Sequence, residues 1–170
     1  NYYYVNKSSL PKVYGGFNTS LSWKGFDLSA IFAYSIGGYI YNRDITMILH
    51  NGSLEGRDWS TEILRRWTPE NRYTDVPALS TTSNNWNSAS TRFLQNNSYM
   101  RLKNLTLSYN LPKQLISKLA LSSVQVFVQG DNLFTIHRNQ GLDPEQGITG
   151  ITYYRYPAMR TISGGINLSF

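Results

Sequence analysis

The sequence predicts an all-β fold in which five antiparallel strands form one part of a large transmembrane β-barrel. Apolar and polar residues alternate with period two in five segments, each long enough to cross a bilayer as a tilted strand. The connections between these segments are alternately short and long, as in outer-membrane barrels. Only 15% of the 170 residues are charged, whereas Asn, Ser and Thr together number 48. The polar positions therefore carry mainly hydroxyl and amide groups.

The first two alternating segments are residues 12–23 and 26–36. Odd positions are apolar in the first segment and even positions in the second. Only Lys24 and Gly25 separate them, and a two-residue connection containing glycine favours a tight hairpin, because glycine tolerates positive φ. We therefore expect these segments to pair as neighbouring antiparallel strands.

The other three strands are expected at residues 99–111, 122–134 and 158–170. Two long connections, residues 37–98 and 135–157, show no sustained alternation. Loops of this length are uncommon inside compact domains but usual on the outer side of membrane barrels. We therefore assign both connections to the extracellular side and the short turns to the periplasmic side.

Aromatic residues cluster at both ends of the expected strands, as in the two aromatic girdles of a membrane barrel. Five strands are too few to close a barrel, and open edges in lipid would leave unpaired backbone groups. The chain is therefore expected to be one end of a larger barrel. The alternative is a soluble β-sandwich that binds carbohydrate and buries the apolar face between two sheets.

Several other classes are excluded by composition. The chain has no Cys and only two His, so disulfide frameworks, thiolate metal sites and three-His sites are absent, and we expect neither metal nor cofactor. The net charge is +6, but basic residues do not interleave with stacking aromatics, so nucleic-acid binding is not expected. No Gly-x-Ser-x-Gly motif or paired carboxylate site indicates an enzyme.

One short helix is expected inside the first long loop. Asp58 or Ser60 is a suitable N-cap, and Trp59, Ile63 and Trp67 follow the four-residue spacing of one helical face. We expect these three apolar side chains to hold the helix against the barrel rim.

Several blocks in the chain carry a family resemblance. They are PKVYGGF at 11–17, WKGFDL at 23–28, NSYMRLKNLTLSYNLP at 97–112, GDNLFT at 130–135, GLDPE at 141–145, and YP at 156–157 continuing through RT at 160–161 to GINLSF at 165–170. In their order and spacing these blocks resemble the C-terminal portion of the SusC/RagA family of TonB-dependent outer-membrane transporters from Bacteroidetes. The loop from about residue 42 to 96 departs from the family pattern.

This resemblance implies a barrel of about 22 strands with a plugged lumen, of which the chain supplies the last five. The plug domain and the N-terminal extension would lie outside these residues. It also implies a place in the cell outer membrane, contact with outer-membrane lipid, and a SusD-like surface lipoprotein acting as lid. Energy would come from TonB through the absent N-terminal part, and the cargo would be oligosaccharides or oligopeptides.

The end of the sequence resembles the signal that the outer-membrane assembly machinery reads. Its residues are the aromatic Phe170 and, on the same face of the expected strand, Leu168, Ile166 and Ile162. The alternative is an ordinary edge strand.

Other candidate residues lie in the long loops. Aromatic side chains that could stack on ligand or contact the lid, or simply pack within the loops, are Tyr39, Tyr41, Trp59, Trp67, Tyr73, Trp86, Tyr153 and Tyr154. By their place in the family pattern, Asp143, Pro144 and Glu145 are expected to form a loop turn, with a cation site or a pair of catalytic carboxylates as the weaker alternatives. Arginines that could meet acidic lipid head groups or an acidic patch on the lid are Arg57, Arg65, Arg66, Arg72 and Arg92.

Overall fold

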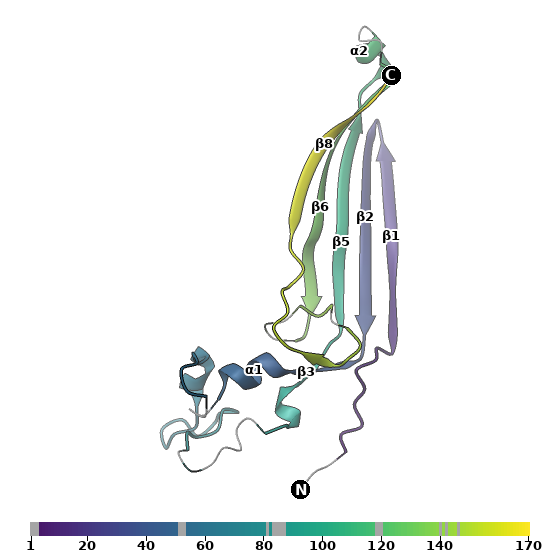
Figure 1. Cartoon of the computed structure of the whole chain (residues 1–170). Coiled ribbons are helices and arrows are strands. Elements are labelled where there is room, and N and C mark those ends of the chain that lie inside the picture. The colour runs from purple at the N-terminus through teal and green to yellow at the C-terminus, as the bar shows by residue number, and fades with distance from the viewer. Residues whose placement is uncertain are drawn as a thin grey trace.

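The computed structural model shows one long, narrow antiparallel sheet with irregular loops gathered at one end (Figure 1). It describes residues 4–50, 54–80, 82, 88–117, 121–139, 141, 143–145 and 147–170. Short turns join the strands at the opposite end of the sheet, where the chain also ends (Figure 1). This arrangement places both long connections at the same end, so their side chains can act together.

Five strands in the order β1-β2-β5-β6-β8 form the sheet, and every neighbouring pair is antiparallel. Their bounds are β1 Val13–Trp23, β2 Phe26–Ile36, β5 Tyr99–Asn110, β6 Ser123–His137 and β8 Thr161–Ser169. The prediction of an all-β fold is confirmed. β6 continues beyond residue 134 because it pairs with β5 as far as His137, and β8 begins only at Thr161 because its pairing with β6 ends at Asp131.

Further short elements lie outside the five long strands. A second, three-stranded sheet joins β4 Leu94–Asn96, β3 Tyr39–Asn42 and β7 Ile151–Thr152. Helix α1 is Arg43–Ile48, the 3₁₀ helices η1 and η3 are Thr61–Arg65 and Thr91–Phe93, and α2 is Lys113–Ile116 at the short-turn end. Strands of two to four residues are too short to show a period, so alternation cannot reveal them.

The strand register keeps the two kinds of residue on opposite faces of the five-stranded sheet. Residues that face each other across neighbouring strands project on the same side. One such row is Leu21, Leu28, Leu107, Val128 and Gly164, and the adjacent row is Ser20, Ser29, Thr106, Gln129 and Ser163. We call these sides the apolar face and the polar face.

The apolar face is not covered by other parts of the chain that the structure describes. Leu21 is 67% exposed and Val128 is 47% exposed, although both lie in long, regular strands. A sandwich would bury these side chains under a second sheet. The buried apolar residues lie mainly in the loop region instead, where Ile40, Phe93 and Val76 are each about 1% exposed.

A bulge interrupts the pairing of β5 with both of its neighbours. Lys103 on β5 has no partner in the register, and Asn132 and Leu133 are skipped on β6, where Asn132 has a φ of 52°. The apolar positions of β5 therefore change from even, as in Leu102, to odd, as in Leu105. The simple alternation expected over 99–111 holds only after the bulge.

The expected helical face of Trp59, Ile63 and Trp67 is wrong. The element is a 3₁₀ helix of five residues capped by the side chain of Ser60, which accepts from the backbone N–H of Glu62. It has three residues per turn, so a four-residue spacing does not form one face. Ile63 packs against Val76, whereas both tryptophans lie outside the helix and are 42% exposed.

Among the described residues, none of the helices has both the length and the apolar character needed to span a membrane.

Candidate functional site

Side-chain hydrogen bonds run along the polar face of the sheet. Asn104 donates to Asp131 at 2.8 Å, and Thr106 donates to Asn104 at 2.9 Å. Nearer the short turns, Asn110 donates to Asp27 at 2.7 Å, and Asn167 donates to Gln125 at 3.0 Å. The bonded groups are amides, hydroxyls and carboxylates, so this face is suited to a water-filled interior.

At the loop end of the polar face lies a buried arginine. The side chain of Arg101 is 3% exposed, and its Nε donates to Thr135 on β6 at 2.9 Å. Its two terminal nitrogens pair with Asp143 at 2.6 Å and with Glu145 at 2.7 Å, and Lys103 also pairs with Glu145 at 2.6 Å. We call these four charged residues, Arg101, Lys103, Asp143 and Glu145, the ion-pair cluster.

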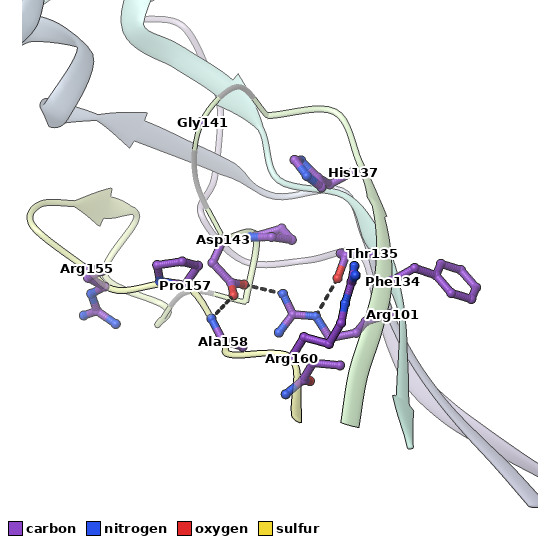
Figure 2. A pocket seen from close by; sticks show the side chains of 12 residues that line it. Arg101, Phe134, Thr135, His137, Gly141, Asp143, Arg155, Pro157, Ala158 and Arg160 are labelled. Atoms are coloured by element: carbon purple, nitrogen blue, oxygen red, sulfur yellow. Dashed lines mark hydrogen bonds and ion pairs between the residues drawn. The ribbon is translucent and has the colours of Figure 1, made fainter. Parts of the chain in front are cut away.

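The Asp143 carboxylate links the second long loop to β5 and to the segment just before β8. It accepts hydrogen bonds from the Arg101 guanidinium and, at 2.6 Å, from the backbone N–H of Ala158 (Figure 2). It also accepts from the backbone N–H of Glu145 at 2.9 Å. Burial acts to raise the pKa of Asp143, but the bonds from Ala158, Glu145 and Arg101 outweigh it and hold that pKa below its ordinary value. The loop is therefore fixed to the polar face by charge and by backbone hydrogen bonds.

Neighbouring amides extend this attachment. Asn97 donates to the carbonyl of Pro144 at 2.9 Å and accepts from Asn139 at 3.0 Å, while the ring of His137 contacts the carbonyl of Asn139 at 2.9 Å. The expected loop turn at Asp143, Pro144 and Glu145 is thus an attachment point as well. No local sequence pattern indicates the pairing with Arg101, because the partners lie on separate elements.

A hollow of about 530 Å³ lies beside the ion-pair cluster. Figure 2 shows Arg101 between Thr135 and Asp143, with Arg155, Pro157 and Arg160 on the chain segment that returns to β8. The lining combines guanidinium groups with apolar surface from Phe134 and Pro157. Such a lining suits a ligand that carries hydrogen-bond acceptors, which guanidinium groups bind well.

The predicted aromatic residues fall into separate groups. Tyr39 and Tyr41 are half-buried on β3, and the ring of Tyr41 contacts Phe93 edge-on at 6.1 Å. Trp59 contacts His50 at 5.2 Å, and Tyr73 is fully exposed. Trp86 lies outside the described residues. These contacts show that several of the predicted aromatic residues pack within the loops. Their contacts with ligand or lid stay a prediction.

Tyr153 and Tyr154 form the most developed aromatic group. Their ring centroids are 4.1 Å apart, and Arg43 lies 4.8 Å above the Tyr153 ring. Arg57 donates to the Tyr154 hydroxyl at 3.0 Å and lowers its pKa, while the Tyr154 backbone N–H donates to Asp44 at 3.0 Å. Tyr154 has a φ of 48°, which is unfavourable for a bulky side chain, so these contacts hold it in a strained position.

The residues of the expected assembly signal lie on or just after β8. Ile162, Ile166 and Leu168 pair with Gly130, Val126 and Val124 and so belong to the apolar face. All three are more than half exposed, and Phe170 is 91% exposed. Their role in assembly stays a prediction.

Within the part of the chain that the structure describes, no group of three or more His, Cys, Asp or Glu residues is arranged to hold a metal ion.

Comparison with curated proteins finds relatives over nearly the whole chain. TonB-dependent receptor P3 of Formosa agariphila is 34% identical over an alignment of 166 residues, which covers 91% of this chain and 16% of that protein. TonB-dependent receptor SusC of Bacteroides thetaiotaomicron is 30% identical over an alignment of 170 residues, which covers 98% of this chain and 16% of that protein. The chain thus spans only a small part of these relatives. No protein-family model matches the sequence.

Solved structures give the same result for the fold. The RagAB peptide importer in its open-open state matches with a TM-score of 0.86 and 35% identity, covering 98% of this chain and 18% of the matched chain. The closed-closed state of the same importer matches with a TM-score of 0.83 at the same identity and coverage.

The long sheet, its two distinct faces and these relatives define the class: the chain is a segment of a TonB-dependent receptor. Within that class it belongs to the SusC/RagA family, as its matches to SusC and to the RagAB importer show. The relatives are named receptors and importers, which agrees with the prediction that the chain is not an enzyme.

Proposed function

We propose that the chain forms part of the wall and the outer loops of a TonB-dependent importer in the cell outer membrane. The observation that carries this proposal is the separation of polar and apolar residues across the whole register of the five strands. In a membrane barrel the apolar face contacts lipid and the polar face lines the aqueous interior. The strands have 9 to 15 residues, which is long enough to cross the hydrocarbon core when tilted.

The cargo we propose is an oligopeptide or an oligosaccharide. Peptide import is the activity named for the RagAB structures that the chain resembles. Aromatic side chains such as Tyr154 and guanidinium groups such as Arg160 are suited to contact either kind of polymer, by stacking or by hydrogen bonding. The chain therefore contributes passage and recognition, while chemical conversion of the cargo would occur elsewhere.

The partner we propose is a SusD-like surface lipoprotein that closes over the outer loops as a lid. The long loops all lie at one end of the sheet, where such a lid would meet them (Figure 1). Energy would reach the complex through TonB, which would act on the N-terminal part of the full protein. Assembly into the membrane would use the apolar residues of β8 with Phe170.

Uptake by the full-length protein tests this proposal. Cells that express it with its neighbouring lipoprotein would receive labelled oligopeptides in one arm and labelled oligosaccharides in the other. We expect import of one class to require the protein, the lipoprotein and active TonB. Recovery of the protein in the soluble fraction, or uptake unaffected by loss of TonB, would contradict the proposal.

A further inference from the structure

A second hollow, of about 550 Å³, lies at the loop end of the sheet, away from the ion-pair cluster. It is lined by Lys7, Lys12 and Arg138, together with the hydroxyl-bearing side chains of Tyr39 and Ser98. Among the described residues that line it there is no Asp or Glu, and none of its three cations forms an ion pair with another described residue. The hollow thus combines uncompensated positive charge with several hydrogen-bond donors.

The backbone holds this hollow in shape. The backbone N–H of Lys12 donates to Ile36 at 2.8 Å, and that of Tyr39 donates to Ser8 at 2.9 Å. Between these two bonds, Gly38 has a φ of 76°, and a Cβ there would lie 2.9 Å from the Ser9 carbonyl oxygen. The segment that carries Lys7 and Lys12 is therefore closely packed against the end of β2 and the start of β3.

Two of the three cations, Lys7 and Lys12, act on the side chain of Tyr39. The Lys7 ammonium group lies 4.6 Å from the centre of the Tyr39 ring. A hydrogen bond from Lys7, and to a smaller extent the charge of Lys12, lowers the pKa of the Tyr39 hydroxyl. Both lysines therefore act on the same phenol oxygen, although they come from different positions along the segment.

Strand alternation indicates which face of the sheet this hollow adjoins. Ser35, Tyr99 and His137 lie opposite one another on the polar face. Ile36 directly follows Ser35 within β2, so it lies on the apolar face. Arg138 directly follows the last residue of β6. The apolar surface reaches the hollow itself, because Leu10 and Ile36 line it and both are more than half exposed.

We propose that this hollow binds the phosphate of a lipid headgroup in the outer leaflet of the membrane. The inference rests on the proposed function, which places the loop end of the sheet at the outer surface and the apolar face in lipid. A lipid bound there would extend its acyl chains along Leu10 and Ile36 and present its headgroup to Lys7, Lys12 and Arg138. Basic pockets immediately beyond an apolar membrane surface suit anionic headgroups in this way.

The test uses the full-length protein purified from outer membranes in detergent. One variant carries Lys7→Gln, Lys12→Gln and Arg138→Gln. A matched control carries Lys24→Gln, Arg43→Gln and Lys113→Gln, so it loses the same charge at positions that neither line the hollow nor belong to the arginines expected to meet lipid. The probes are bisphosphorylated lipid A and its dephosphorylated counterpart, with retained lipid measured by native mass spectrometry and binding titration.

We expect the unmodified protein and the control to prefer the phosphorylated probe, and the variant to bind it about fivefold more weakly for each cation removed. Equal binding of both probes by the unmodified protein, or equal losses in variant and control, would overturn the inference. An unchanged lipid affinity with weakened binding of an acidic peptide would also overturn it, since the hollow would then serve the cargo.

Uptake measured in the same cells separates this inference from the proposed function. If the unmodified protein resides in the outer membrane and imports its cargo but binds both lipid probes equally, only the inference of a lipid site is contradicted. If it neither resides there nor imports, the proposed function fails and the lipid site fails with it.

Discussion

Arg101 carries a charge that is almost wholly buried, and its contribution to the fold depends on Asp143. A buried guanidinium that loses its carboxylate partner remains desolvated without compensation. Asp143→Ala also removes acceptors from the backbone N–H groups of Glu145 and Ala158. We expect the free energy that holds residues 138–160 on the sheet to fall by about 3–5 kcal/mol, measured by hydrogen exchange in the full-length protein.

The control for this prediction is Glu62→Ala, which breaks a pair with Arg65 in which both side chains are about half exposed. Such surface pairs contribute less than about 1 kcal/mol, so exchange near residue 62 should change little. Similar effects of the two substitutions would show that the ion-pair cluster does not fix the loop.

Acid should release the same loop. The pKa of Asp143 is lowered in the folded protein, so this group stabilises the attachment fully above its unfolded pKa of about 4 and progressively less as pH falls through the folded value. Hydrogen exchange across residues 138–160, corrected for intrinsic rates, should therefore accelerate in strong acid. In Asp143→Asn the pH dependence should shrink, and an undiminished dependence would mean that another group controls it.

At the scale of single elements, each strand should tolerate charge on one face only. Leu28 and Ser29 are neighbours in β2, but their side chains lie on the apolar and polar faces. Leu28→Arg places a charge in lipid and should cost about 2–4 kcal/mol if that position lies near the bilayer midplane. Ser29→Arg faces water and should be nearly neutral. Folding of the full-length protein into lipid vesicles, followed by denaturant titration, measures both.

The opposite ranking, with Ser29→Arg the more damaging, would mean that the polar face is the one packed against a dry environment.

The long strands were predictable because each has at least nine residues, enough for the alternation to indicate which face each side chain occupies. Phe127 interrupts the polar positions of β6, and the absence of a side chain on Gly165 leaves room for its ring. A Cβ on Gly165 would lie 2.9 Å from the ring. The short strands β3, β4 and β7 were not predictable, because their pairing depends on chain segments far apart in sequence. The bulge at Lys103 moves the apolar residues of β5 from even to odd positions, and only the strand register reveals this change.

The candidate sites were likewise predictable only in part. Asp143 and Glu145 were found by local turn chemistry, but their partner Arg101 lies 42 residues from Asp143 and 44 from Glu145. The cations of the second hollow come from two segments far apart in sequence, Lys7 and Lys12 before β1 and Arg138 after β6, and share no motif. Contacts made by tertiary folding leave no local pattern, so sequence reasoning could identify the loops and not the clusters within them.

For the molecule as a whole, the sheet is incomplete. β1 pairs only with β2 and β8 only with β6, so each leaves one edge without a partner strand among the described residues. Unpaired edges and an exposed apolar face favour aggregation in water. We expect this chain, expressed alone, to aggregate, whereas the full-length protein should remain in detergent-extracted outer membrane and resist heat.

A soluble, monomeric product from the isolated chain would contradict this expectation and favour an independent domain. Size-exclusion chromatography of the isolated chain and heat-dependent gel migration of the full-length protein distinguish the two results.

The central claim is that the polar face meets water and the apolar face meets lipid, and cysteine scanning tests it most directly. The chain contains no native cysteine, so single cysteines can be placed along β5 from Asn104 to Tyr109 in the full-length protein, with any cysteine elsewhere replaced. In intact outer membranes, a charged water-soluble maleimide should label the even positions 104, 106 and 108 and spare the odd positions 105, 107 and 109. Equal labelling of even and odd positions, or stronger labelling of the odd positions, would contradict this claim.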